Sequence, residues 1–234
     1  MDSYSINNET SEFSGVSSGE LPSIINQLEP KIVAVDIFDT LIHRKVHPED
    51  VKKIVAVRTL EAIYSPNLKW RDLYGFRNQL EREICLENVA KDRDMEFSFP
   101  CYCERLHNLL DEKGYFEKLP SLNRFSMILS DIELSVERSI QYSDTNVKNL
   151  LVQLHKRGVL IYFISDFYLP STMLAEMLSW HGIKDCYQEI LSSSDFLETK
   201  RTGKLYKRFL RAVNKPPELI VMVGDNEEAD GKMA

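Results

Sequence analysis

The chain has 234 residues, of which 43% are hydrophobic and 28% are charged, and its formal net charge is −7. This composition is typical of a globular protein with one large domain or two smaller ones. The sequence has no run of Lys and Arg that would follow a phosphate backbone, which argues against nucleic acid as a partner. The longest apolar runs, such as residues 159–164, have the length of a strand and are too short to span a membrane.

The N-terminus is polar and acidic, and it lacks the charged and then apolar pattern of a signal peptide. Four cysteines do not make a disulfide framework in a chain of this length, so we expect reduced thiols and a cytoplasmic location. Cys101 and Cys103 lack the spacing and the second ligand pair of a zinc site. We interpret them as buried thiols on a helix.

The N-terminal region combines a polar tail with the first predicted strand. Residues 1–20 are rich in Ser, Asn, Glu and Gly, so we expect a disordered tail. A short helix is predicted over 21–29, and the apolar run after Lys31 predicts a strand buried on both faces. That strand ends at Asp36, and the carboxyl ends of strands in open α/β sheets face the crevice that binds ligands. The alternative interpretation is an aspartate that caps a turn.

The middle of the chain is predicted to be entirely helical. Helical spacing begins at Pro48 and recurs over 70–89, 99–110 and 121–142, with no strand-like run between these stretches. This pattern predicts a helical domain over 48–142, inserted after the first strand. We interpret His43 and His47 as loop residues near the first strand.

Helices and strands alternate in the last third of the chain. The predicted elements are a helix over 144–157, a strand over 159–164, a helix over 171–182, a strand over 189–191, a helix over 203–213 and a strand over 219–223. Single helices between strands imply right-handed crossovers in a parallel, doubly wound sheet. The sequence therefore predicts an α/β, Rossmann-like domain formed by 21–47 and 143–234.

Polar residues follow the predicted strands, and parallel strands would gather them at one edge of the sheet. These residues are Asp36, Asp39 and Thr40 after the first strand, Ser165 and Asp166 after the second, Lys200 after the third, and Asp225 and Asp230 after the fourth. A carboxylate can attack phosphorus, and a divalent cation relieves the repulsion between carboxylate and phosphate. The set therefore fits phosphoryl transfer through an aspartyl intermediate.

The stretches Asp36-Ile-Phe-Asp-Thr-Leu, Ile164-Ser-Asp, Lys200 and Gly224-Asp-Asn-Glu-Glu-Ala-Asp resemble the four motifs of the haloacid dehalogenase superfamily. The resemblance covers about residues 30–234, and the helical insert is similar to that superfamily's cap of the first type. It implies a Mg²⁺-dependent phosphatase that acts on a small phosphorylated metabolite, such as a sugar phosphate.

The resemblance also assigns a role to each matched residue. Asp36 would be the nucleophile, Ser165 a phosphate ligand and Lys200 the motif lysine. The metal site would comprise Asp36, the backbone carbonyl of Phe38, Asp225 and, as outer support, Asp230. We also expect Thr40 and Asp166 to contact the substrate. Lys204 is the alternative to Lys200, but a lysine just before a helix reaches the crevice more easily.

Two further stretches, 165–170 and 199–206, resemble a branch of the superfamily associated with polysaccharide biosynthesis. This narrower resemblance implies a glycosyltransferase or another polysaccharide-synthesis protein as a partner. The chain ends shortly after the fourth motif, so we expect an incomplete C-terminal end. The fourth strand would then be an uncovered edge, or an edge that a partner covers.

Phe38 is the main departure from the superfamily pattern, since many phosphatases have an acid–base aspartate there. General acid catalysis is typically worth about 10²–10⁴-fold in rate. Asp39, Asp166, His43 and residues of the helical insert are candidates for a replacement acid. Two alternatives therefore remain open beside the phosphatase. One is a degenerate, non-catalytic binding or scaffold domain, and the other is a 2-haloacid dehalogenase.

Overall fold

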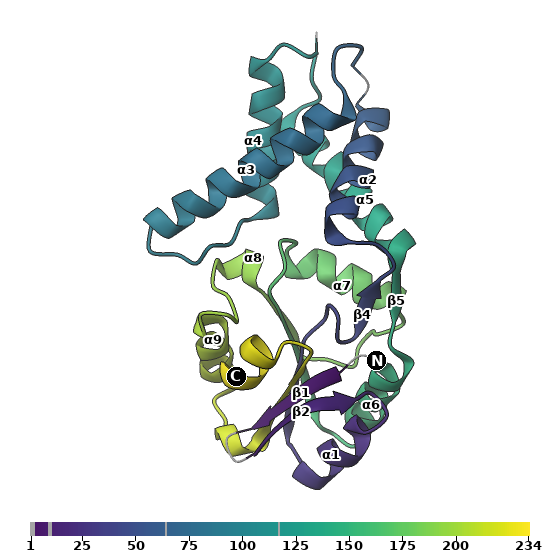
Figure 1. The fold of residues 1–234 in the computed structure, drawn as a ribbon, viewed down its shortest axis with the longest axis vertical. Coiled ribbons are helices and arrows are strands. Elements are labelled where there is room, and N and C mark those ends of the chain that lie inside the picture. The colour runs from purple at the N-terminus through teal and green to yellow at the C-terminus, as the bar shows by residue number, and fades with distance from the viewer. Residues whose placement is uncertain (1–2, 9–10, 64, 117) are drawn as a thin grey trace. The chain divides into compact units, whose positions relative to one another are not determined.

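The computed structural model describes residues 3–8, 11–63, 65–116 and 118–234, which form two compact units (Figure 1). The core unit comprises residues 1–43 and 142–234, and the helical unit comprises residues 44–141. The chain crosses between them close to the expected positions, 47–48 and 142–143. Both crossings run through short strands, β4 (Ile42–Arg44) and β5 (Gln141–Ser143), which pair in a two-stranded sheet.

The core unit contains the four predicted parallel strands. They are β3 (Ile32–Val35), β6 (Leu160–Ser165), β7 (Glu189–Ser192) and β8 (Ile220–Gly224). They lie in the order β8-β3-β6-β7, and each neighbouring pair is parallel. Val35 pairs with Phe163 on one side and with Val223 on the other, so the carboxyl ends of these strands lie level. The α/β, Rossmann-like prediction is confirmed.

The prediction of a disordered N-terminal tail is wrong. The described residues 3–8 and 11–17 form β1 (Ser3–Asn8) and β2 (Ser11–Ser17), which pair antiparallel, and β1 also pairs antiparallel with β8. Tyr4 and Ile6 are fully buried, and this alternation of apolar residues is masked when composition is averaged over twenty residues. β1 also covers the edge of β8, which the sequence had predicted to be open.

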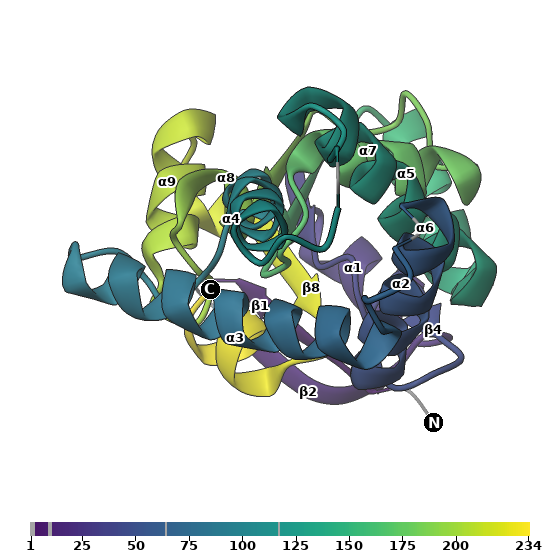
Figure 2. The same cartoon turned by 90° about the horizontal axis from the view of Figure 1, so that it is seen from above.

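Helices cover both faces of the sheet (Figures 1 and 2). They are α1 (Leu21–Leu28), α6 (Thr145–Lys156), α7 (Ser171–Trp180), the one-turn α8 (Ser193–Phe196) and α9 (Lys204–Val213). α9 packs Leu205 and Phe209 against Ile32 and Ala34 of the central strand. Asp144 begins α6 by accepting hydrogen bonds from the amides of residues 146 and 147, as expected of an N-cap.

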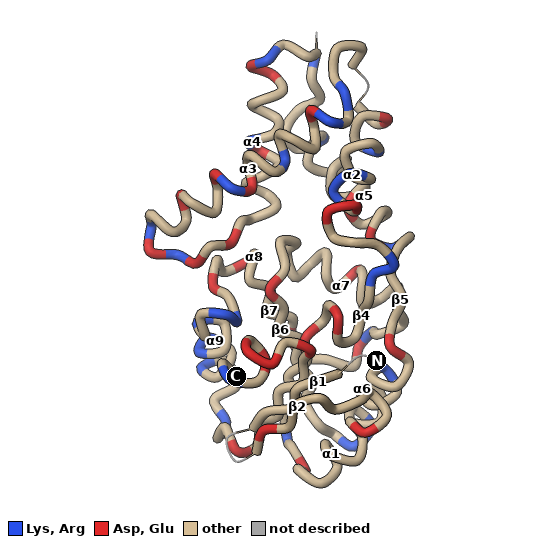
Figure 3. Tube along the Cα trace, in the orientation of Figure 1, with Lys and Arg blue, Asp and Glu red and all other residues tan. Residues whose placement is uncertain are grey.

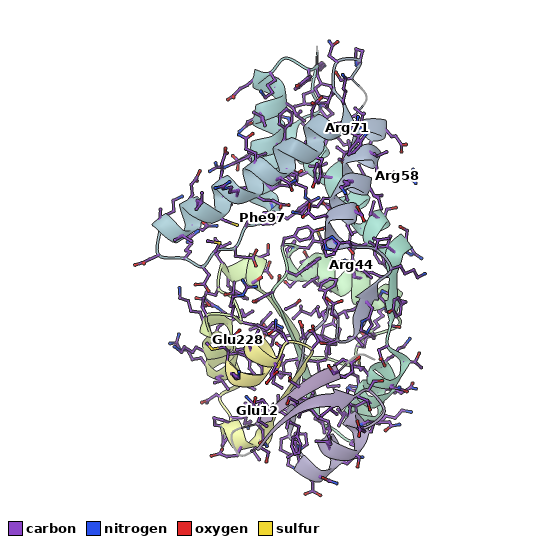
Figure 4. All side chains as sticks on the ribbon, viewed as in Figure 1. Glu12, Arg44, Arg58, Arg71, Phe97 and Glu228 are labelled. Atoms are coloured by element: carbon purple, nitrogen blue, oxygen red, sulfur yellow. The ribbon has the colours of Figure 1, made fainter. Side chains whose placement is uncertain are left out.

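The described part of the helical unit contains four helices. They are α2 (Pro48–Ala62), α3 (Trp70–Ala90), α4 (Phe99–Glu112) and α5 (Leu122–Ile140). α4 appears end-on beside α3 in Figure 2, so these two helices cross. Arg44, labelled in Figure 4, makes a two-pronged ion pair with the buried Glu137 of α5, at 2.9 and 3.0 Å.

Two expectations for single residues of the helical unit are changed by the structure. His47 caps α2 by accepting a hydrogen bond from the Glu49 amide, so it is more than a loop residue. Cys103 is buried as predicted, whereas Cys101 is only partly buried. In the part of the chain that the structure describes, no helix is long and apolar enough to cross a membrane.

Candidate active site

The loop after β3 places Asp36 at the carboxyl edge of the sheet. The Asp36 amide donates to the Val223 carbonyl of β8 at 2.9 Å, which continues the sheet pairing for one more residue. The chain then turns tightly, because the amides of Leu41 and Ile42 both donate to the Ile37 carbonyl. Asp39 adopts a left-handed backbone with a φ of 56°. Glycine is favoured in that conformation and aspartate is tolerated, so Asp39 can form this turn.

A buried lysine joins two of the motif carboxylates. The ammonium of Lys200 lies 3.0 Å from Asp36 Oδ1 and 2.7 Å from Asp230 Oδ1, and all three residues are buried. The Ile37 amide donates to the same Asp36 Oδ1 at 2.8 Å. Asp36 Oδ2 accepts no hydrogen bond from any residue that the structure describes. It is therefore the oxygen that is free to bind a cation or attack an electrophile.

Burial and like charge govern the protonation of this cluster. Burial raises the pKa of Asp36 to about 8, against the opposing effect of the Lys200 ammonium. The pKa of Lys200 is also raised, since the attraction of Asp36 and Asp230 outweighs the cost of burying the ammonium. The Lys200 ammonium is therefore a permanent positive charge in the site. The Asp36 carboxylate is held in a place where its charge is costly.

The loop before α9 positions Lys200 through Asp166. The Asp166 carboxylate accepts hydrogen bonds from the backbone amides of Lys200 at 2.7 Å and Arg201 at 3.4 Å. Asp166 therefore holds the lysine loop, and its expected contact with substrate stays a prediction. Lys204 is exposed on the first turn of α9, whereas Lys200 points its ammonium into the site.

The segment after β8 brings Asp225 and Asp230 to the same edge. A π-helical turn, η2 (Glu227–Lys232), follows Asn226, whose side chain accepts hydrogen bonds from the amides of residues 228 and 229. Glu228, labelled in Figure 4, lies on this turn. The turn returns Asp230 so close to Gly224 that a Cβ on Gly224 would lie 2.2 Å from Asp230 Oδ2. Glycine at the end of β8 is therefore a steric requirement for this carboxylate.

Both oxygens of Asp230 are occupied by protein donors. Oδ1 accepts from Lys200 and from the buried hydroxyl of Tyr206 at 2.9 Å, and Oδ2 accepts from the Asn226 amide at 3.2 Å. Thr40 was expected to contact substrate, but its hydroxyl donates to Asp225 Oδ1 at 3.3 Å. Asp230 is therefore bound on both oxygens by the protein and holds Lys200 in place, whereas Asp36 and Asp225 line the pocket.

The carboxylates form a donor set that suits a hard divalent cation. Asp36, Asp225 and Asp230 each offer an oxygen, and these oxygens all lie within 4.8 Å of one another. Mg²⁺ binds through one or two carboxylates and completes its octahedron with water and phosphate oxygens. Asp36 and Asp225 fit that requirement. Acidic residues gather at this edge of the core unit in the charge-coloured trace (Figure 3).

We expect the affinity for Mg²⁺ to rise with pH until the Asp36 carboxyl has lost its proton, at a pKa of about 8. The sign follows because a carboxylate ligand must be deprotonated, so protons compete with the ion below that pH. Calorimetric titration with Mg²⁺ from pH 6 to pH 9, in buffers of different ionisation enthalpy, measures both the affinity and the protons released. An affinity that stays flat across this range would contradict the expectation that a ligand carboxyl with a pKa of about 8 binds the ion.

A pocket of about 200 Å³ opens over these groups. It is lined by Asp36, Phe38, Asp39, Ser165, Asp166, Lys200, Arg201, Asp225, Asn226 and Ala229. The Ser165 hydroxyl makes no hydrogen bond with any residue described in the structure, so it is available to a ligand. His43, a candidate replacement acid, is buried against Tyr142 and does not line this pocket.

Several residues that shape the site were missed in the sequence. Tyr206 holds Asp230, and Phe167 stacks on Phe38 with ring centroids 3.9 Å apart. Both belong to stretches noted only for their resemblance to one branch of the superfamily. Tyr206 lies two residues beyond Lys204 on the buried face of α9, and it could have been found by projecting that helix.

A family model for haloacid dehalogenase-like hydrolases matches residues 30–234. The chain belongs to this family. The match covers the core unit from residue 30 onward and the whole helical unit. No match was found among curated proteins.

The chain is similar to several solved structures. A 2-haloacid dehalogenase from Pseudomonas syringae pv. Tomato DC3000 aligns with a TM-score of 0.56 and 17% identity, over 82% of this chain and 76% of that chain. A putative beta-phosphoglucomutase from Thermotoga maritima aligns with a TM-score of 0.46 and 17% identity, over 82% and 74%. A predicted phosphoglycolate phosphatase from Haemophilus somnus 129pt aligns with a TM-score of 0.44 and 14% identity, over 82% and 75%. The Pseudomonas structure supports the haloacid dehalogenase-like fold of this hydrolase.

Proposed function

We propose that this hydrolase is a Mg²⁺-dependent phosphatase that acts through an aspartyl-phosphate on a small phosphorylated metabolite. The observation that carries the proposal is the arrangement around Asp36. Its Oδ1 is held by Lys200 and the Ile37 amide, whereas Oδ2 has no protein donor among the described residues. A carboxylate with one fixed oxygen and one free oxygen is oriented for attack on phosphorus.

The proposed reaction has two steps. Asp36 Oδ2 attacks phosphorus, and the bond from phosphorus to the leaving oxygen breaks with its electron pair on that oxygen. Water then attacks the aspartyl-phosphate, which releases inorganic phosphate and restores the carboxylate. The Lys200 ammonium and the Ser165 hydroxyl stabilise the negative charge that spreads over the phosphoryl oxygens in both steps.

The carboxylates Asp36 and Asp225 would hold the cation, with Asp230 orienting the site from behind. When bound, Mg²⁺ neutralises the charge of carboxylate and phosphate and so permits their approach. The same carboxylate cluster argues against the 2-haloacid dehalogenase, since displacement of halide by a carboxylate requires no cation. A degenerate binding domain is the remaining alternative, and the missing acid at Phe38 is the feature in its favour.

We expect the purified protein to release phosphate from 4-nitrophenyl phosphate in the presence of Mg²⁺ and to lose this activity with EDTA. Asp225→Asn should raise the Mg²⁺ concentration needed for half-maximal turnover, because it removes one of the two outward-facing carboxylates. Colorimetric phosphate release over a series of Mg²⁺ concentrations measures both effects.

Two other results would favour the alternatives. Tight Mg²⁺ binding without turnover of any phosphate ester would favour the degenerate binding domain. Halide release from 2-chloropropionate without added metal would favour the dehalogenase.

A further inference from the structure

The pocket has one aromatic lining residue, Phe38, two positions after the nucleophile. Phe38 lines the pocket, and its ring stacks on Phe167 with an interplanar angle of 25°. Tyr168 packs next, with its ring centroid 4.5 Å from that of Phe167. Phe167 and Tyr168 are both half-buried and lie behind the Phe38 ring rather than among the lining residues.

Serine hydroxyls hold these aromatic residues in place. Ser193 Oγ accepts a hydrogen bond from the Phe167 amide at 2.9 Å. Ser192 Oγ lies 3.1 Å from the Phe167 carbonyl and 2.7 Å from the Leu169 carbonyl, and it donates to this pair of acceptors. Both serines are fully buried at the end of β7. These hydrogen bonds therefore hold the loop that carries Phe167 against β7, and Phe167 in turn holds the ring of Phe38 by stacking.

The pocket offers few proton donors to a leaving oxygen. The Lys200 ammonium is bound by two carboxylates, and both oxygens of Asp166 accept backbone hydrogen bonds. Asp36 and Asp225 face the proposed cation. Asp39 is the remaining carboxyl among the lining residues, and it is exposed.

We propose that this hydrolase acts on phosphoryl compounds whose leaving group is flat and weakly basic: an aryl, enol or acyl phosphate. The inference rests on the proposed phosphatase function and narrows its substrate class. The bond from phosphorus to oxygen breaks with the electron pair on the leaving oxygen. That oxygen departs as a stabilised anion, so it needs no proton from the protein. Meanwhile its flat, delocalised group lies against the ring of Phe38, which Phe167 supports by stacking.

Four probes test the leaving group: 4-nitrophenyl phosphate, phenyl phosphate, acetyl phosphate and glycerol 2-phosphate. We expect kcat/KM to fall steeply as the leaving group becomes more basic, so that glycerol 2-phosphate is the slowest. Phe38→Asp places a carboxyl beside the leaving oxygen and should raise the rate on glycerol 2-phosphate relative to acetyl phosphate by about 10²-fold or more. Asp39→Asn should leave the dependence of kcat/KM on leaving-group basicity unchanged.

The aromatic contact is tested separately with Phe38→Leu, which keeps an apolar side chain but removes the ring. We expect KM for 4-nitrophenyl phosphate to rise about threefold to tenfold, the usual worth of an aromatic pair, with KM for acetyl phosphate unchanged. Phe13→Leu is the matched control, because Phe13 lies on β2 and does not line the pocket. Circular dichroism and thermal melting establish that each variant is folded.

Different failures are distinguishable. Comparable wild-type rates on glycerol 2-phosphate and 4-nitrophenyl phosphate would overturn the leaving-group inference and leave the phosphatase standing. A steeper dependence in Asp39→Asn would identify Asp39 as a general acid and overturn the inference in the same way. An equal rise in KM for aryl and acetyl phosphates in Phe38→Leu would overturn the aromatic contact. No phosphate release from any of the four probes would overturn the phosphatase function itself.

Discussion

Replacing Asp36 with asparagine should reduce phosphate release by at least about 10³-fold, as expected when a covalent nucleophile is removed. The amide keeps the shape of the carboxylate and can still accept hydrogen bonds from Lys200 and the Ile37 amide. It cannot form an acyl phosphate. Steady-state kinetics on 4-nitrophenyl phosphate measure the loss, and acid quenching followed by mass spectrometry should detect the phosphorylated aspartate in the wild type alone.

The same substitution should not lower stability, which separates a chemical effect from unfolding. Burial raises the pKa of Asp36, so the charged carboxylate is held at a cost that a neutral amide does not bear. Thermal melting at pH 8 should therefore give a Tm equal to or above that of the wild type. Asp131→Asn, on an exposed position of α5, is the matched control for both measurements. Retention of more than a tenth of the turnover in Asp36→Asn would exclude Asp36 as the nucleophile.

The four parallel strands were predictable because a strand buried on both faces of a sheet is a short run of β-branched and other apolar residues, as in Ile32–Val35. Polar residues directly after each run mark where the strand ends. The parallel order then brings the motif residues to one edge without further information. The N-terminal pair of strands, β1 and β2, was not predictable in the same way. Its burial depends on pairing β1 with β8, which lies more than two hundred residues later, and local composition carries no trace of that contact.

The details of the site depend on geometry that residue spacing does not contain. Asp166 and Thr40 are polar residues at strand ends, yet both make hydrogen bonds within the protein. Asp166 accepts from the Lys200 amide, and the Thr40 hydroxyl donates to Asp225. The π-helical turn that returns Asp230 against Gly224 is likewise invisible in spacing. The residue types at strand ends therefore predict which side chains lie together at the edge of the sheet. Which atoms of those side chains remain available to a ligand follows only from their hydrogen bonds.

Replacing Lys200 with methionine should destabilise the protein by about 3–5 kcal/mol, because it leaves buried carboxylates without their cation. Asp36 and Asp230 lie 3.0 and 2.7 Å from the ammonium, and no other Lys or Arg side chain pairs with them in the described chain. Urea unfolding measures the loss. Lys204→Met is the matched control on the exposed start of α9, and we expect it to change stability by no more than about 0.5 kcal/mol.

The loss in Lys200→Met should depend on pH with a predictable sign. The folded-state pKa of Asp36 is raised from an ordinary value of 3.8 to about 8 in the wild type, so the folded state retains a proton that the unfolded state has released between these values. The free energy of unfolding that Asp36 contributes therefore falls as pH rises from 3.8 to about 8. Removing the ammonium raises the folded-state pKa of Asp36 further, so this fall continues to higher pH. The deficit of Lys200→Met should be larger at pH 8.5 than at pH 5.5.

The double variant with Asp36→Asn should recover part of this deficit, about 0.5–3 kcal/mol of coupling free energy. A deficit that is independent of pH and unchanged in the double variant would show that Lys200 acts through packing rather than through charge.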